Sequence, residues 1–280
     1  MFDSVIHRWM KVPYTLHVRY NRKPKKPRTT VLFIHGIGNT GEAWHDVIER
    51  LPQDIRIITI DLLGFGDSPK PKWAIYNAQS QANAVLATYL KLRITSQVVI
   101  VGHSLGALVG IEIAKRYPLL VDSLILCSPP LYNTNDTKNT ILPRTDKLLR
   151  RLYQSAMQRP EEFVRLSAFA MKYKLINQSF NVTETNVDSY MAALESMIIN
   201  QTSFDDAYRL STPTRMIRGT LDPFVVARNL RQLAKANPHI TLSKVISGHE
   251  VRGLFVPAVV HAIEDRLQTF ERRGIKKSND

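Results

Sequence analysis

Gln-Val-Val-Ile-Val-Gly-His-Ser-Leu-Gly, at residues 97–106, changes from strand-like to helix-like sequence across a single serine. The residues before Gly102 are apolar and mostly β-branched, whereas residues 107–116 repeat apolar side chains at helical spacing. The last five letters fit the pattern G-x-S-x-G, in which a strained turn holds the serine hydroxyl above a sheet. The pentapeptide alone is a weak signal, but the strand before it and the helix after it provide the expected context. We therefore predict that Ser104 is a nucleophile.

Strand-like and helix-like segments alternate along most of the chain. Residues 14–20 alternate like a half-exposed antiparallel strand at an edge, and a charged, frayed tail is expected at residues 272–278. This alternation predicts an α/β fold in which helices flank a mostly parallel central sheet. Further strands are expected at 30–34, 55–60, 121–127, 213–219 and 240–246, and helices at 44–51, 77–92, 107–116, 225–236 and 255–270.

The alternation stops between residues 131 and 210. This segment is rich in helix-like sequence, at residues 143–158, 160–175 and 184–201. An insertion of this length must act as a lid or cover a surface of its own. The expected organisation is therefore an α/β core made of residues 1–130 and 211–280, interrupted by a helical lid at residues 131–210.

Chemically useful side chains follow the predicted strands, and in parallel sheets such groups gather beyond the carboxyl ends of the strands. Ser104, Asp222 and His249 occur in that order, each in a turn after a strand. Serine is a weak nucleophile until a neighbouring imidazole takes its proton, so His249 is the expected base. Asp222 is the expected acid that orients it, with Asp205 or Asp206 as alternatives.

The chain resembles the α/β-hydrolase superfamily through His35-Gly36, residues 61–68, Gly102 to Gly106, Asp222 and His249. The resemblance extends along nearly the whole length, and the chain order of serine, acid and histidine is the one expected of that family. It implies an α/β-hydrolase fold with an inserted helical cap and an active site of the serine esterase or lipase type.

Attack on a carbonyl places negative charge on its oxygen, which two backbone amides are expected to receive. They belong to Leu105, at the start of the helix after the serine, and to Ile37, after His35-Gly36. His103 and His35 are interpreted as orienting or structural groups. Asp61 and the glycines after it are interpreted as a turn that shapes the floor of the pocket.

The composition argues against metal and cofactor chemistry. The eight histidines are scattered without short-spaced ligand pairs, so no metal site and no cofactor are expected. The single cysteine, Cys127, ends an apolar run, is expected to be buried and inert, and excludes an intrachain disulfide. Because the sequence contains no signal-peptide core and no apolar stretch of membrane-spanning length, a cytoplasmic protein is expected.

The formal net charge of +14 raises the question of an anionic partner. The basic residues are scattered, apart from a proline-containing run at residues 22–28 that suits a solvated loop, so no nucleic-acid partner is expected. Phe2, Val5, Ile6, Trp9 and Pro13 lie at helical spacing with Arg8 and Lys11 nearby. This stripe either packs on its own domain or makes a weak peripheral contact with an anionic membrane. The oligomeric state remains undetermined.

The leading hypothesis is a metal-free serine hydrolase that cleaves a carboxylic ester with a small to medium, hydrophobic acyl group through an acyl-serine intermediate. The resemblance also allows a thioesterase, an acyltransferase or a carbon–carbon bond hydrolase with the same three residues. Serine at position 104 argues against epoxide hydrolases and haloalkane dehalogenases, which place aspartate there. A receptor that binds a small molecule without turnover is the alternative from another class.

Overall fold

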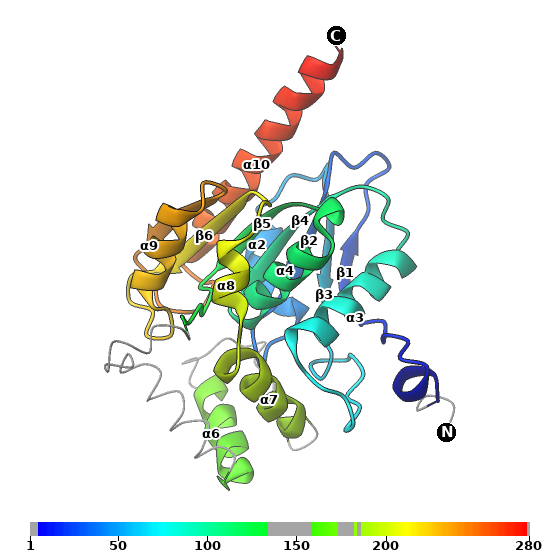
Figure 1. Cartoon of the computed structure of the whole chain (residues 1–280), viewed down its shortest axis with the longest axis vertical. Coiled ribbons are helices and arrows are strands. Elements are labelled where there is room, and N and C mark those ends of the chain that lie inside the picture. The colour runs from blue at the N-terminus through cyan, green and yellow to red at the C-terminus, as the bar shows by residue number, and fades with distance from the viewer. Residues whose placement is uncertain (1–4, 134–157, 173–181, 184–185, 279–280) are drawn as a thin grey trace.

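The computed structural model describes residues 5–133, 158–172, 182–183 and 186–278. Seven strands form one sheet in the order β1-β3-β2-β4-β5-β6-β7, and every neighbouring pair is parallel except β1 with β3 (Figure 1). The prediction of a mostly parallel sheet with an antiparallel edge strand is therefore confirmed. The strands are β1 (Val18–Arg22), β2 (Thr30–Ile34), β3 (Arg56–Ile60), β4 (Val98–His103), β5 (Val121–Cys127), β6 (Thr214–Gly219) and β7 (Ile240–Val245).

Helices cover both faces of this sheet. In β2, Leu32 and Ile34 belong to the larger core cluster, whereas Val31 and Phe33 belong to the second, so alternate residues of one strand pack on opposite faces. The larger cluster joins the sheet to α3 (Ala78–Lys91), α4 (Leu105–Arg116), α8 (Ser203–Tyr208) and α9 (Ala227–Ala236). The second cluster joins it to η2 (Gly41–Trp44), α2 (His45–Ile48) and α10 (Phe255–Ser278). Because both faces are covered, all residues of β2, β3, β4 and β5 are buried.

The predicted insertion contains α6 (Pro160–Lys172), α7 (Val187–Ala193), the π-helical η4 (Leu194–Ile199) and α8. Figure 1 shows α6 and α7 at one end of the long axis, away from the carboxyl end of α10. The helix expected at residues 143–158 lies almost entirely outside the described residues. The helix expected at 184–201 is divided between α7 and η4 in the described residues 186–199, and α8 was not predicted.

Two predictions at the chain ends differ from the structure. The first strand begins at Val18 rather than at residue 14, because Tyr14 and Leu16 are buried in the core before the chain reaches the sheet edge. The last helix continues to Ser278, where a frayed tail was predicted. Among the described residues, no helix is long and apolar enough to span a bilayer.

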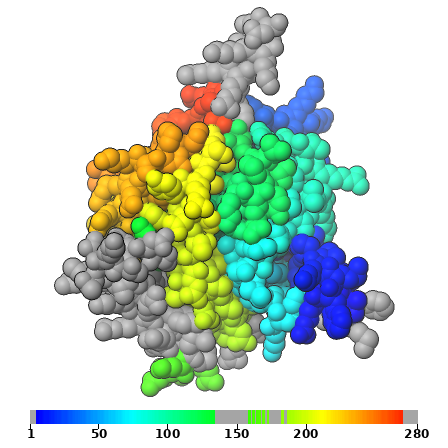
Figure 2. Space-filling model, viewed as in Figure 1, coloured from blue at the N-terminus to red at the C-terminus, as the bar shows by residue number. Residues whose placement is uncertain are grey.

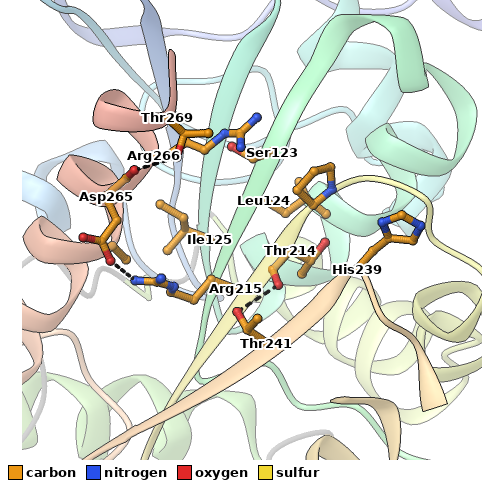
Figure 3. A pocket seen from close by; sticks show the side chains of 12 residues that line it. Ser123, Leu124, Ile125, Thr214, Arg215, His239, Thr241, Asp265, Arg266 and Thr269 are labelled. Carbon is orange, nitrogen blue, oxygen red and sulfur yellow. Dashed lines mark hydrogen bonds and ion pairs between the residues drawn. The ribbon is translucent and has the colours of Figure 1, made fainter. Parts of the chain in front are cut away.

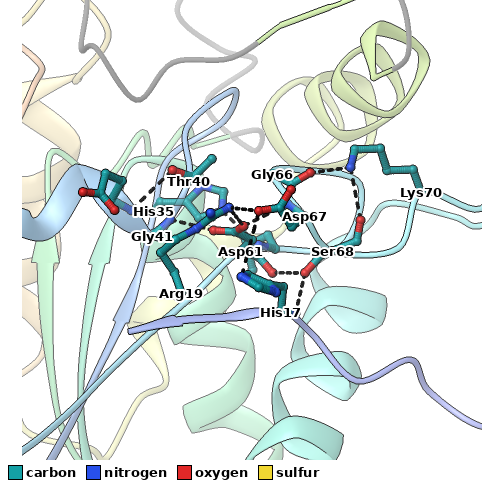
Figure 4. Close-up of polar contacts among 12 residues, drawn as sticks. His17, Arg19, His35, Thr40, Gly41, Asp61, Gly66, Asp67, Ser68 and Lys70 are labelled. Atoms are coloured by element: carbon teal, nitrogen blue, oxygen red, sulfur yellow. Dashed lines mark hydrogen bonds and ion pairs between the residues drawn. The ribbon is translucent and has the colours of Figure 1, made fainter. Parts of the chain in front are cut away.

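The turn after β3 is organised by a buried carboxylate (Figure 4). The side chain of Asp61 is fully buried, and its Oδ2 accepts from Arg19 Nη2 at 2.5 Å and from the amide of Asp67 at 2.9 Å. Its Oδ1 accepts from the amide of Gly41 at 2.8 Å. Burial raises the pKa of Asp61, but the bonds from Arg19 and from the two amides outweigh burial and hold the pKa below its ordinary value. Asp61 therefore ties the edge strand to the loops beside the carboxyl end of β3.

We expect Asp61→Asn to lower the free energy of unfolding by roughly 3 kcal/mol, because an amide cannot accept from all these donors and leaves Arg19 without its buried partner. Asp67→Asn is the matched control, since Asp67 contacts the same guanidinium at 2.6 Å but is 63% exposed. It should cost less than about 1 kcal/mol. Urea denaturation measures both, and equal losses would contradict this account.

The stability difference between the wild type and Asp61→Asn should depend on pH. The depressed pKa of Asp61 means that its ionised form stabilises the fold at neutral pH, and that this stabilisation is lost as the pH falls through the folded-state pKa. The stability difference between the wild type and Asp61→Asn should therefore shrink in acid. A difference that stays constant from neutral to acidic pH would show that the charge of Asp61 contributes nothing.

Candidate active site

The turn between β4 and α4 has the strained geometry that its sequence predicts. Ser104 has φ 51° and ψ −118°, a positive φ that non-glycine residues seldom adopt. A Cβ on Gly106 would overlap the carbonyl oxygens of Ile34 and of His35, the latter at 2.6 Å, and a Cβ on Gly102 would overlap the backbone of Gly106. The two glycines therefore allow α4 to approach β2 and β4 closely enough to form the turn.

The segments that carry the two predicted oxyanion-hole amides lie beside Ser104. Leu105 is the first residue of α4, so its N–H has no acceptor within the helix and lies at the positive end of the helix dipole. A Cβ on Gly36 would lie 3.3 Å from Ser104 Cβ, which places the loop that contains Ile37 directly beside the serine. The structure thus brings together the segments that carry Ser104, Leu105 and Ile37.

His35 holds this loop in place. Its Nδ1 lies 2.7 Å from the carbonyl oxygen of Gly36, and its Nε2 lies 2.9 Å from the amide of Leu62. The amide can only donate, so Nε2 accepts and Nδ1 carries the proton. Complete burial lowers the pKa of His35 to about 4, which keeps the ring neutral at physiological pH. These contacts agree with the structural role expected for His35.

Asp222 and His249 meet beyond the carboxyl ends of β6 and β7. Nδ1 of His249 lies 2.8 Å from Oδ2 of Asp222, and Oδ1 of Asp222 accepts from the amide of Phe224 at 2.8 Å. Burial raises the pKa of Asp222, but the hydrogen bond and charge of His249, with the amide of Phe224, hold the pKa below its ordinary value. An ionised Asp222 fixes the proton of His249 on Nδ1, which leaves Nε2 free to accept one.

His103 connects the histidine turn to the serine turn. It precedes Ser104 and is fully buried, and its Nε2 lies 3.0 Å from the carbonyl oxygen of His249. The two imidazole rings have centroids 5.0 Å apart. Since a carbonyl can only accept, His103 donates, and the loop that carries His249 is anchored to the residue next to Ser104. The sequence suggested an orienting role for His103 but gave no sign of this partner.

The alternative acids lie elsewhere. Asp205 and Asp206 are both on α8, and Oδ2 of Asp206 accepts from Lys115 Nζ at 3.0 Å on the outer surface. Cys127 is free and buried, and burial raises the pKa of its thiol, which agrees with an inert residue. Asp222 is the candidate acid that the structure places against His249.

Two other groups of polar residues resemble sites, and in both the charged side chains already have partners. His17, Asp61 and Asp67 have ligand atoms close enough together to hold a metal, but Arg19 Nη2 lies within 2.6 Å of both carboxylates and supplies the positive charge there. A hollow of about 200 Å³ at the amino ends of β6 and β7 contains the ion pair of Arg215 with Asp265 (Figure 3). That hollow is at the opposite sheet edge from Ser104, and its charged side chains are already paired.

The described part of residues 131–210 lies against the loops of the site. The hydroxyl of Tyr132 donates to the carbonyl of Phe224 at 2.9 Å, and the ring of Phe224 lies edge-on to that of His249 with centroids 5.0 Å apart. Burial, together with the negative charge of Glu250, raises the pKa of the Tyr190 hydroxyl on α7. A Cβ added to Gly64 would lie 2.8 Å from the Cβ of Ser189, so α7 packs directly on the turn after β3.

A family model described as the alpha/beta hydrolase fold matches residues 29–251 of the chain. This match includes the serine turn, Asp222 and His249. The chain belongs to the alpha/beta hydrolase family. The family membership predicted from the sequence is therefore confirmed, and so is the α/β-hydrolase fold.

Individual members of the alpha/beta hydrolase family define the resemblance further. Over 122 residues the chain is 31% identical to a protein of Arabidopsis thaliana named probable lysophospholipase BODYGUARD 4. The matched region makes up 43% of this chain and 29% of that protein. Less than a third of that curated relative is thus matched. A thermophilic esterase of Thermogutta terrifontis has a similar structure, with a TM-score of 0.70, 21% identity, and coverage of 91% and 93% of the two chains.

A second solved structure shows how far the fold alone can be interpreted. A haloalkane dehalogenase of Agrobacterium tumefaciens has a TM-score of 0.69 at 16% identity, and the match covers 91% of this chain and 97% of that one. At such identities the likeness establishes the fold alone. The reaction must therefore be argued from the side chains of the site.

Two glycines of α4 give a test of the close approach beneath the serine. Gly106→Ala should lower the free energy of unfolding by at least about 2 kcal/mol, because the new methyl meets backbone carbonyl oxygens that cannot move aside. Gly110→Ala is the matched control: its Cβ would have its nearest contact at 3.4 Å, with Ile100 Cγ2. Alanine favours helix over glycine, so this variant should be neutral or stabilised by up to about 1 kcal/mol. Similar losses in urea denaturation would contradict the packing described.

Proposed function

We propose that the protein hydrolyses a carboxylic ester through an acyl intermediate on Ser104. The observation that carries this proposal is the 2.8 Å hydrogen bond between His249 Nδ1 and Asp222 Oδ2, on loops anchored by His103 to the serine turn. A neutral imidazole with Nδ1 protonated has one free nitrogen, Nε2, and this is the arrangement that a general base for serine requires.

The reaction takes place in two halves. As Ser104 Oγ attacks the ester carbonyl, its proton passes to Nε2 of His249, and Asp222 stabilises the imidazolium that forms. The negative oxygen of the tetrahedral intermediate is received by the amides of Leu105 and Ile37, and each donor typically contributes about 3 kcal/mol to transition-state stabilisation. His249 then returns the proton to the departing alkoxide. Water attacks the acyl-serine by the same steps and releases the carboxylic acid.

Residues 131–210 form the lid over this site in our proposal, with residues 1–130 and 211–280 as the core. Support comes from the contacts of Tyr132 with Phe224 and of α7 with the turn at Gly64. Apolar residues of α7, of α6 and of the segment before α7 form a small cluster of their own: Val187, Met191 and Val182, with Val164 and Tyr190 at its margin. We infer that the acyl group is hydrophobic and of small to medium size. The name of the partial relative, a probable lysophospholipase, supports an ester of the lipid kind.

Activity toward short and medium p-nitrophenyl esters tests the proposal, together with labelling by a fluorophosphonate and peptide mapping of the adduct. The label should be found on Ser104, and Ser104→Ala should abolish both labelling and turnover. Hydrolysis that survives this substitution would contradict the mechanism. Binding of a small molecule without any turnover by the wild type would favour the receptor alternative instead.

The role of the acid has its own test, with a matched carboxylate as the control. Asp222→Asn should lower kcat/KM by roughly 10⁴-fold, because the amide no longer fixes the tautomer of His249 or stabilises the imidazolium. Asp206→Asn, which affects the surface ion pair with Lys115 and the hydrogen bond from Thr202, should leave kcat/KM within about twofold of the wild type. Equal losses from the two variants would mean that Asp222 acts through stability alone.

A further inference from the structure

Two segments that are distant in the sequence form one surface beside α3. We call residues 5–13 and 69–76 together the N-terminal patch. His7 stacks on Tyr14 with ring centroids 3.7 Å apart, and Tyr14 lies 6.0 Å from Trp73. The Nδ1 atom of His7 is also 2.7 Å from the carbonyl oxygen of Val12, which folds the segment back on itself. Figure 2 shows this dark-blue segment projecting from the surface beside the cyan part of the chain.

Large apolar side chains of the N-terminal patch point into solvent. Trp9 is 80% exposed and Met10 is 66% exposed, while Ile75 in the second segment is 67% exposed. No residue of η1 (Val5–Trp9) is buried. Of the apolar stripe predicted from the sequence, Val5, Ile6 and Trp9 are exposed, and Phe2 lies outside the described residues. Two of the three tryptophans in the sequence lie in the patch, and the third, Trp44, is buried.

The charge of the patch has one sign. It contains Arg8, Lys11, Lys70 and Lys72, and neither segment contains an aspartate or glutamate. Arg8, Lys11 and Lys72 are exposed. Lys70 Nζ donates to the backbone carbonyls of Gly66 and Ser68, which holds its charge against the turn after β3 (Figure 4). Exposed apolar groups ringed by cations complement an anionic surface that has an apolar interior.

The patch also has a defined position relative to the site. Figure 1 shows the N-terminal turn and the cyan loop after β3 toward the same end of the long axis as α6 and α7, opposite to the end of α10. On α6, Leu166 and Phe169 are 67% and 56% exposed. The patch and α6 thus lie toward the same end of the molecule, and both expose large apolar side chains there.

We propose that the N-terminal patch docks on the surface of a bilayer that contains anionic lipids. Trp9 and Met10 enter the boundary between headgroups and acyl chains, and Arg8, Lys11 and Lys72 contact the lipid phosphates. A short apolar face of this kind reaches about 5–10 Å into the interface without crossing the membrane. The aliphatic residues and the projecting shape favour lipid over single-stranded nucleic acid, which binds in basic grooves lined by stacking aromatic rings.

Flotation of the full-length protein with phosphatidylcholine vesicles, with and without phosphatidylglycerol, tests this inference at low salt. The protein should float only with the vesicles that contain phosphatidylglycerol, and salt should release it. Tryptophan emission should shift to shorter wavelength on binding. Trp9→Phe should remove most of the shift, because Trp44 is already buried and Trp73 is partly buried against the core, whereas Trp9 is exposed. Equal flotation with both vesicles, or none, would overturn the proposal.

Charge and apolar variants locate the contact. Arg8→Glu combined with Lys11→Glu should weaken binding by about 25-fold or more, since each basic residue near the membrane strengthens binding about fivefold. Lys235→Glu on α9 alters the charge of an exposed lysine away from the patch, and it should change binding by less than about twofold. Trp9→Ser with Met10→Ser should also abolish flotation, whereas Leu119→Ser, at a residue 83% exposed beside β5, should not.

Two further measurements test membrane docking independently of the proposed ester hydrolysis. Ser104→Ala should bind vesicles as the wild type does, because the docking surface does not involve the serine, so failure of the proposed hydrolysis leaves this test intact. The patch variants should keep their activity on soluble p-nitrophenyl esters and their unfolding transitions. If the Arg8 and Lys11 variants instead lose binding to an oligonucleotide but not to vesicles, the patch recognises a nucleic acid and the inference is wrong.

Discussion

The close approach of α4 to the sheet is the constraint on which the rest of the structure depends. Where Gly106 passes the carbonyl oxygens of Ile34 and His35, there is no space for a side chain. This contact sets the angle at which the chain leaves β4, and that angle forces Ser104 into a positive φ with its side chain beside the loop at Gly36. The packing of α4 against α3 and the sheet holds this strained residue in place. The geometry at Ser104 therefore depends on the packing of the core.

Much of the fold could be predicted because its signals are local. Residues 31–34 and 124–127 are continuous apolar runs, and the strands predicted around them, at 30–34 and 121–127, have those bounds in the structure. A strand that is buried on both faces needs no alternation of polar and apolar residues. The residues of the site could be predicted for a related reason. In a parallel sheet every carboxyl end lies at one edge, so Asp222 and His249 were expected near each other and near the serine turn, and the structure brings the first two within 2.8 Å.

Other features depend on contacts between distant segments and left no local signal. The pairing of Arg19 with Asp61 joins residues 42 positions apart, and the bond from His103 to the carbonyl of His249 joins residues 146 apart. The division of the expected helix at 184–201 into α7 and η4 is likewise not marked by any proline or glycine. Residues 272–278 carry too few apolar side chains to indicate burial, yet the backbone of α10 remains helical there, since helix propagation needs only one further bond per residue.

The bond from His103 to His249 joins the turn that carries His249 rigidly to the turn that carries Ser104. Its acceptor is a main-chain carbonyl, so the identity of the side chain at 249 does not affect it, whereas the identity of the side chain at 103 does. The two turns are therefore constrained together, because a change that displaces one of them also displaces its partner in this bond. The same holds for protein engineering, because a chimera with its junction between residues 103 and 249 keeps this bond only if the parent that supplies the amino-terminal part has a donor at position 103.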